Sequence, residues 1–293
     1  MSRVEISSLT EGPIKSCARV DVERIEIGEM GPKWSRRWMI VDSDGKFMLS
    51  DKHPKMVFVE PQVSETDNVL VLKGRGYGHQ VDIPIRDEGP RRIVEMFNSG
   101  MRYEAVDDGE EAANWLGEYL NIDGARLVHM PADVIRHDGR GLARFNFADS
   151  WSMSLGNVAS LDELNRRIVA IGRSPVSKER FGHDMWITGA GSFAEDLWGK
   201  IKVNGQVIVV VKPIERCSRT LVKREVEVAD ELLKKDKEPL ATLATFRKDS
   251  QSVKTIFGQK LAPEWTGEPQ EIHVGDKVEV VVYKAPPDLI SSK

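Results

Sequence analysis

Short runs of apolar and β-branched residues, each closed by turn residues, fill the first third of the chain. They alternate with polar residues or stay apolar over strand length, at residues 3–9, 19–27, 38–50, 56–63, 68–74 and 80–85. The Asp44-Gly45 pair lies between two apolar stretches and predicts a β-hairpin. Many short strands joined by tight turns are typical of barrel-like units.

Two later segments change to helical spacing. Residues 108–120 place apolar side chains on one face, and Asp108 with Glu111 predicts a capping box at the start of a helix. Residues 160–172 repeat the pattern, with Ser160 as the expected cap.

Strand patterns return in the second part of the chain, at residues 125–132, 184–189, 200–212, 220–228 and 273–284. The fold class expected from this pattern is α+β and predominantly β. The turn after residue 120 places a boundary between a first domain at 1–122 and a second at 123–293.

Composition excludes several classes of protein. The chain of 293 residues has a net charge of -4 and a pI near 6.0, which argues against a dedicated nucleic-acid binder. No apolar run is long enough to span a membrane, and the first residues lack a signal-peptide core. Two cysteines fit a reducing compartment, so we expect a cytoplasmic protein in which Cys17 is a small buried hydrophobe.

Several motifs follow one another in a fixed order. They read PIKSC at 13–17, SRRWMIVDSDGKF at 35–47, FAEDLW at 193–198, VKPIERC at 211–217, EPLATLATFR at 238–247, IFGQK at 256–260 and HVGDKVEV at 273–280. The later motifs resemble the C-terminal domain of molybdenum-cofactor sulfurases, the MOSC domain. The earlier ones resemble the β-barrel domain that precedes it in many proteins, among them the mitochondrial amidoxime-reducing components and their bacterial counterparts.

Cys217 is the catalytic and metal-binding candidate. The resemblance implies that this cysteine, preceded by Arg216, supplies the thiolate that ligates the molybdenum of a molybdenum cofactor. A soft thiolate suits a soft metal centre, and neighbouring cations favour the deprotonated form. Arg216 acts on the thiol through its field or serves another group of the cofactor. The alternative for Cys217 is an inert buried thiol at a strand end.

The cofactor implied by the resemblance is a pterin that carries a phosphate. Lys15, Ser16 and Arg36 then hold the phosphate or the ring, with Arg37 in place of Arg36 if the register slips by one. The FADS segment at 147–150 likewise points to two further cofactor-binding residues, Asp149 and Ser150. Asp149 could instead cap the turn that follows it.

The segment FGHDM at 181–185 departs from the family pattern. Family members commonly carry Arg-Pro-Asn where this chain has Gly182, His183 and Asp184. The exchange removes a cation and adds Asp184, a carboxylate that we retain as a cofactor-binding candidate. A carboxylate near a phosphate is repulsive unless a metal or another arginine intervenes. His183 is either a loop histidine or a new proton-transfer group.

Three functions are compatible with these residues. The first is an oxidoreductase that uses molybdenum to reduce N-hydroxylated small molecules, with electrons from a separate ferredoxin-like, cytochrome b5-like or flavin reductase partner. The second is a carrier of sulfur as a persulfide on Cys217, since MOSC domains of sulfurases are linked to pyridoxal-phosphate enzymes. The third is a non-catalytic descendant that binds a phosphate-bearing ligand. No nucleic acid and no membrane span are expected for any of them.

Overall fold

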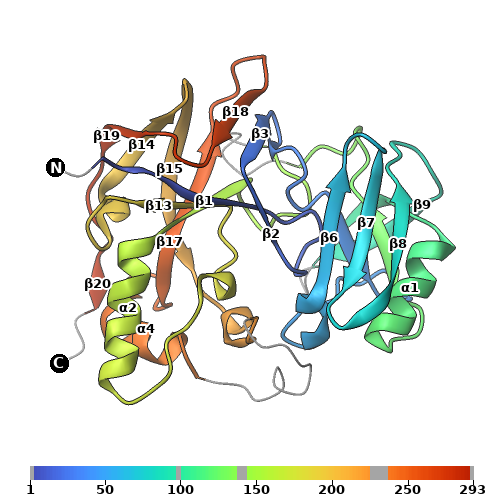
Figure 1. Ribbon diagram of the computed structural model, residues 1–293, viewed down its shortest axis with the longest axis horizontal. Helices are drawn as coiled ribbons and strands as arrows, with labels where there is room; N and C mark the ends of the chain where they lie inside the picture. Colours follow the sequence, from blue (N-terminus) through green and yellow to red (C-terminus); the bar gives the residue numbers. More distant parts are fainter. Residues whose placement is uncertain (1–2, 97–99, 137–143, 225–236, 291–293) are drawn as a thin grey trace.

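The computed structural model describes residues 3–96, 100–136, 144–224 and 237–290. Strands dominate and a few helices pack beside them, which confirms the predicted α+β, predominantly β class. Figure 1 shows two β-rich halves side by side, with the helices α2 (Val158–Ala170) and α4 (Leu240–Phe246) beside one and α1 (Glu110–Leu120) beside the other. No helix in these ranges is long and apolar enough to cross a membrane.

The largest sheet has eight strands in the order β19-β14-β15-β17-β12-β13-β1-β2. These strands span, in that order, Val278–Tyr283, Trp198–Val203, Gln206–Glu215, Ile256–Pro263, Met153–Asn157, Met185–Thr188, Glu5–Glu11 and Val20–Val22. β12 and β13 run parallel, and the other neighbours in the sheet run antiparallel. Its inner face is a continuous apolar core to which both β1 and β17 contribute, through Leu9 and Leu261.

Four smaller sheets complete the architecture, in the orders β5-β11-β10-β9, β6-β7-β8, β18-β3-β4 and β16-β20. Their strands are β3 (Arg24–Gly28), β4 (Gly31–Pro32), β5 (Trp38–Val41), β6 (Val59–Ser64), β7 (Val69–Gly74), β8 (Tyr77–Pro84), β9 (Arg91–Met96), β10 (Met101–Asp107), β11 (Arg126–His129), β16 (Lys248–Asp249), β18 (Gln270–His273) and β20 (Leu289–Ile290). The β6-β7-β8 sheet packs against the helix α1 through a second apolar core.

Strand pairing crosses the boundary that the sequence places after residue 122. β1 and β2 come from the start of the chain and lie in the eight-stranded sheet, where β1 pairs with β13. β11 comes after the boundary and pairs with β5 and β10 of the first half. The domain limits 1–122 and 123–293 stay a prediction. Each part of the chain contributes a strand to a sheet that is built mainly from the other part.

Within the described residues the α-helices are α1 (Glu110–Leu120), α2 (Val158–Ala170) and α4 (Leu240–Phe246), and short 3-10 turns are η1 (Pro54–Phe58), η3 (Lys178–Arg180), η4 (Ala194–Leu197) and η5 (Ser218–Leu221). The predicted hairpin is confirmed, since Val41 and Phe47 bridge across a turn in which Gly45 takes φ +78°. The strand expected at 56–63 is wrong in its first half, because η1 occupies it. Much of the strand expected at 220–228 lies outside the described residues.

Both helix caps expected from the sequence are wrong. Helix α1 begins after Gly109, and Asp108 instead contacts His129 Nδ1 at 2.9 Å. Helix α2 begins after Asn157, whose side chain accepts a hydrogen bond from a backbone N–H of the first turn. Ser160 turns inward and donates to the buried carboxylate of Glu195. In each case a nearby buried partner takes the side chain that local spacing assigns to the cap.

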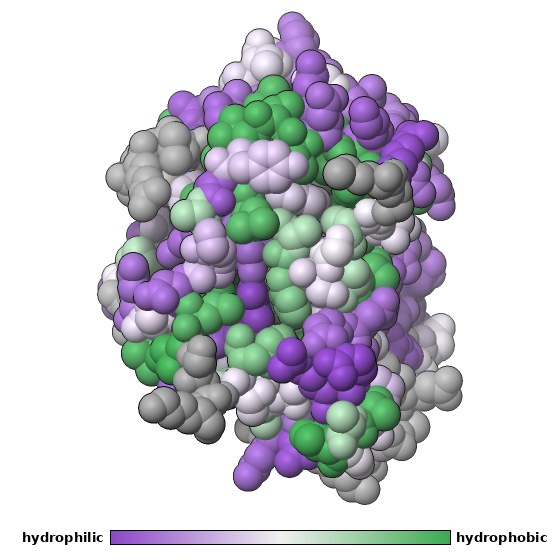
Figure 2. Space-filling model, turned by 90° about the vertical axis from the view of Figure 1, so that its left-hand side faces the viewer, coloured by the Kyte–Doolittle hydropathy of each residue, from purple (hydrophilic) through white to green (hydrophobic). Residues whose placement is uncertain are grey.

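The edge of the eight-stranded sheet at β19 carries exposed apolar side chains at Val281, Val282 and Tyr283. Figure 2 views the molecule from this side and shows hydrophobic and hydrophilic side chains in small, interspersed patches. Mixed patches of this kind are ordinary for a protein surface.

Candidate functional site

One cavity of about 220 Å³ lies between the eight-stranded sheet and the loops that lead into the smaller sheets. Its walls come from the segment after β1, the loop before β12, the end of β15 and the strand β17. Predicted site residues from distant parts of the sequence line it together, and they are Lys15, Ser16, Arg36, Asp149, Ser150, Arg216 and Cys217. Asp184 does not line this cavity.

Cys217 is an exposed free thiol at the cavity wall, directly after β15. β15 pairs with β17 through two register shifts, the second between Pro213 and Glu215. Such irregularities bend a strand and redirect the side chains near its end. Cys17, in contrast, is buried as expected, and burial raises the pKa of its thiol.

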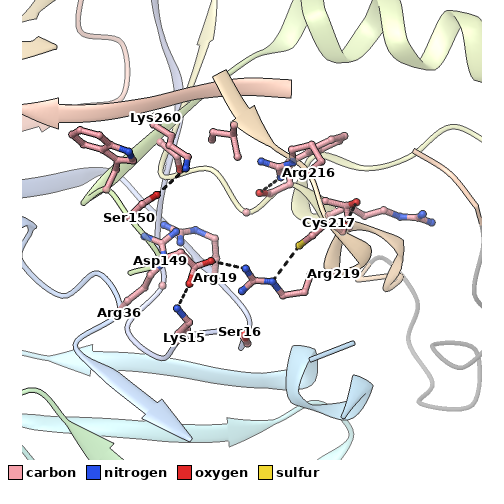
Figure 3. A pocket seen from close by; sticks show the side chains of 18 of the residues that line it. Lys15, Ser16, Arg19, Arg36, Asp149, Ser150, Arg216, Cys217, Arg219 and Lys260 are labelled. Atoms are coloured by element: carbon pink, nitrogen blue, oxygen red, sulfur yellow. Dashed lines mark hydrogen bonds and ion pairs between the residues drawn. The ribbon is translucent and has the colours of Figure 1, made fainter. Parts of the chain in front are cut away.

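A chain of charged groups connects Cys217 to the opposite wall (Figure 3). The Nε of Arg219 lies 3.5 Å from the Cys217 sulfur, and Nη2 of the same side chain donates to Asp149 at 2.6 Å. The other oxygen of Asp149 accepts from Lys15, which also donates to the Phe147 carbonyl at 2.6 Å. Asp149 therefore bridges two cations. In the described residues its carboxylate accepts no backbone hydrogen bond of the kind that a turn cap would make.

The charges in this chain shift one another's pKa values. Burial alone would raise the pKa of Asp149, but the adjacent charges of Lys15 and Arg219 lower it. Burial lowers the pKa of Lys15 to about 8, although Asp149 opposes the shift. Asp149 thus stays ionised at neutral pH, and Lys15 carries most of its charge there.

Ser16 and Arg36 both adopt left-handed backbone conformations, with φ +70° and +50°. Such conformations cost energy for residues other than glycine, and they cluster where ligands are clamped. The Ser16 hydroxyl is buried and has no hydrogen-bond partner among the described residues. Arg37 points elsewhere, over the rings of Trp34 and Trp38, and does not line the cavity.

Other candidates have partners within the protein. Ser150 accepts a hydrogen bond from Lys260 at 2.8 Å, and Lys260 reaches the cavity from β17. Arg216 donates to the Phe181 carbonyl at 2.6 Å, and its charge acts on Cys217 through the field rather than through a hydrogen bond in the described residues. Burial lowers the pKa of Arg216 to about 10, which leaves it charged at neutral pH.

Asp184 is fully buried behind the cavity wall. Its carboxylate receives Arg19 at 2.5 Å and the Ser154 hydroxyl at 2.6 Å, and Arg36 lies 3.9 Å away. Burial would raise the pKa of Asp184, but the charges of Arg19 and Arg36 lower it. As expected from the sequence, an arginine is needed to offset the charge of Asp184 near a phosphate, and Arg19 provides it.

His183 is buried among the rings of Phe181, Trp186 and Phe257. Burial lowers the pKa of His183 well below its ordinary value, and the charge of Arg216 adds to the effect. The imidazole is accordingly neutral at pH 7, as expected of a packed aromatic side chain.

Sequence reasoning missed several cationic residues of the cavity. The Lys and Arg side chains that line it are Lys15, Arg19, Arg36, Arg180, Arg216, Arg219, Arg224 and Lys260, against the acidic Asp149 and Glu215. Glu215 is paired with Lys254 at 3.0 Å. Arg219 lies two residues after Cys217, no local pattern marks Arg19, and nothing in the IFGQK motif indicates that its last residue, Lys260, reaches the cavity. The excess of positive charge suits an anionic ligand.

Comparisons with known proteins identify the domains of this chain. Residues 3–123 match the MOSC N-terminal beta barrel domain, and residues 143–279 match the MOSC domain. Mitochondrial amidoxime-reducing component 1 of Xenopus laevis is 30% identical over 95% of this chain and 82% of its own length. The Mus musculus protein of the same name is 26% identical over 91% and 79%.

A molybdenum cofactor sulfurase of Danio rerio is 25% identical over 89% of this chain, which corresponds to 32% of the sulfurase. The two domain matches come in the order expected from the motifs and cover most of the chain. The chain belongs to the family of MOSC proteins in which a MOSC N-terminal beta barrel domain precedes the MOSC domain, the family that includes the mitochondrial amidoxime-reducing components.

Proposed function

We propose that this protein is a molybdenum-cofactor-dependent oxidoreductase that reduces N-oxygenated small molecules. The observation that carries the proposal is the presence, in one cavity, of an exposed cysteine thiol and a cationic wall with a serine hydroxyl that has no hydrogen-bond partner in the described parts of the chain. The names of its relatives, amidoxime-reducing components and a molybdenum cofactor sulfurase, point to the same chemistry.

The residues of the cavity fit a ligand with a phosphate at one end and a metal at the other. The buried Ser16 hydroxyl lacks a partner within the described residues, and an unsatisfied buried polar atom is costly unless a ligand or water satisfies it. Lys15 and Arg36 line the same cavity and supply the charge that a phosphate requires. Cys217 lies beyond Asp149 and Arg219, and a thiolate is a suitable ligand for molybdenum.

Each residue has a separate task in this proposal. Lys15, Ser16 and Arg36 bind the phosphate, and Asp149 holds Lys15 and Arg219 in place from between them. Arg219 directs one N–H toward the Cys217 sulfur, which stabilises negative charge on it. Ser150, held by Lys260, supplies a polar group to the same cavity. When bound, the cofactor would supply the redox chemistry for removing the substrate's oxygen.

Electrons must then come from a separate protein, and we propose a ferredoxin-like, cytochrome b5-like or flavin reductase donor. The substrate is a small molecule, because the cavity has a volume of only about 220 Å³. A cytoplasmic location stays a prediction from the sequence.

The alternative is transfer of sulfur carried as a persulfide on Cys217. Two features of this thiol favour that function. Its exposure leaves room for a second sulfur atom, and the N–H of Arg219 beside it stabilises negative charge on that sulfur. The likeness to a molybdenum cofactor sulfurase adds to its support.

Elemental analysis of protein made in a cofactor-competent host tests the proposal, together with pterin fluorescence after denaturation. We expect molybdenum and pterin in comparable amounts in the wild type. Cys217→Ser should lose the molybdenum and remain folded. Wild-type protein that contains neither molybdenum nor pterin, but shows a cyanide-releasable sulfur on Cys217, would favour the alternative.

A further inference from the structure

Arg19 is held rigidly at the wall of the cavity. Its Nε donates to the Thr10 hydroxyl and its Nη2 to the Thr10 carbonyl, both at 2.7 Å. Nη2 also pairs with Asp184 at 2.5 Å. In the described parts of the chain, Nη1 has no hydrogen-bond partner. It lies against Gly12, where an added Cβ would come within 2.6 Å of it, and Gly12 also lines the cavity.

The anchoring leaves one edge of the guanidinium for a ligand. A guanidinium has five N–H donors, and the protein fixes the plane of Arg19 through Nε and Nη2. Nη1 lies beside Gly12, and Gly12 and Arg19 line the same cavity as Arg36, Lys15 and Ser16 (Figure 3). A pre-oriented donor of this kind binds an oxyanion without losing side-chain freedom.

Asp184 organises this edge from behind. It has no solvent exposure, and it lies next to both Arg19 and Arg36, at 2.5 and 3.9 Å. Its second oxygen accepts from Ser154. Both guanidiniums therefore stand between the carboxylate and the cavity, so a ligand meets positive charge first.

Gly182 leaves space that Arg19 uses. A Cβ added at Gly182 would find only the Arg19 Cδ nearby, at 3.7 Å, and nothing else within 4 Å. The aliphatic part of Arg19 thus passes the point where a side chain at position 182 would begin. Position 182 lines the cavity in its own right.

We propose that Arg19 is an anion-binding residue of the cavity, that Asp184 positions it, and that it occupies the place of the side chain absent at Gly182. The inference rests on the proposed function in one respect, because the anion is the phosphate of the ligand held by Lys15, Ser16 and Arg36. Asp184 is then a counter-ion of the binding site and has no contact with the ligand.

Calorimetric titration with inorganic phosphate at constant pH and ionic strength tests this role. Arg19→Met alone leaves a buried carboxylate unpaired and endangers the fold. The test therefore uses Arg19→Met together with Asp184→Asn, which removes both charges at once. The matched control is Arg247→Met with Asp196→Asn, which removes a buried arginine–aspartate pair, 2.7 Å apart, outside the cavity.

We expect the first double variant to weaken phosphate binding by about tenfold or more, the usual effect of losing a charged hydrogen bond. The control should bind like the wild type. Adding Gly182→Arg to the first double variant should recover part of the affinity. Phosphate affinity within twofold of the wild type in the Arg19→Met, Asp184→Asn protein overturns the inference.

Lys15→Ala separates this result from a failure of the proposed function. If Lys15→Ala abolishes phosphate binding and the Arg19 variant does not, only the role of Arg19 is wrong. If neither substitution changes phosphate binding, the phosphate site of the proposed function is wrong as well.

Discussion

Asp184→Ala should be among the most damaging single substitutions outside the apolar core. The carboxylate is fully buried, receives Arg19 at 2.5 Å and the Ser154 hydroxyl at 2.6 Å, and has Arg36 nearby. Removing one partner of a buried ion pair typically costs about 3–5 kcal/mol, because the remaining charge loses its compensation. Arg19 is largely buried, so water can replace the carboxylate only in part. We expect a loss in this range, which is a large share of the stability of an ordinary domain.

Urea unfolding followed by tryptophan fluorescence measures the effect. The matched control is Glu163→Ala on helix α2, because Glu163 also accepts hydrogen bonds from two arginines, Arg166 and Arg167, but at the surface. That control should lose about 0.5 kcal/mol or less. A free energy of unfolding for Asp184→Ala within about 1 kcal/mol of the wild type would refute the reasoning about burial.

The effect should also depend on pH. The charges of Arg19 and Arg36 lower the pKa of Asp184 below its ordinary value of 3.8, despite burial. A carboxylate with a lowered pKa in the folded state contributes stability above the unfolded pKa and loses it as pH falls through the folded value. The difference between wild type and Asp184→Ala should therefore be constant from pH 5 to 7 and shrink in acid below roughly pH 4. A difference that grows on acidification would contradict this assignment.

Three further predictions concern other parts of the fold. Sulfate, whose charge is constant in this range, should bind more weakly as pH rises through about 8, where Lys15 loses its proton; calorimetry showing no change up to pH 9 would exclude Lys15 from the site. Gly258→Ala should destabilise by about 2–5 kcal/mol, because φ is +74° and the new Cβ would lie 2.2 Å from His183; an unchanged urea midpoint would contradict this. Asn157→Ala should lose about 1–3 kcal/mol, since it removes a helix cap and a buried bond to Glu195; denaturation equal to the wild type would show otherwise.

The strands were largely predictable from the sequence because their signal is local. Alternation along 68–74 and the Asp44-Gly45 turn reflect the side-chain period and the backbone of the same few residues. The helix caps were not predictable, because Asp108 and Ser160 have partners 21 and 35 residues away in the chain. A side chain in a cap motif can bind such a distant partner instead of the helix end, and the local sequence contains no sign of that partner.

The candidate site divides in the same way. Lys15, Ser16 and Cys217 stand in motifs that can be read along the chain, and the structure brings them to one cavity. Arg19 stands in no motif, and the IFGQK motif does not indicate that Lys260 faces the cavity, because that follows from the pairing of β17 with distant strands. The carboxylate at Asp184 looked repulsive in isolation, because the arginine that neutralises it is 165 residues away.

The placement of β1 in the eight-stranded sheet has a consequence for how the protein is made. β1 ends at Glu11 and its neighbour β13 begins at Met185, so the long segment between them must be synthesised before the two strands can pair. The walls of the cavity join residues as far apart as Lys15 and Arg219, and contacts at such separation close slowly. The binding chamber is thus among the last parts of the molecule to assemble, and a ligand present at that stage could be enclosed as the halves meet.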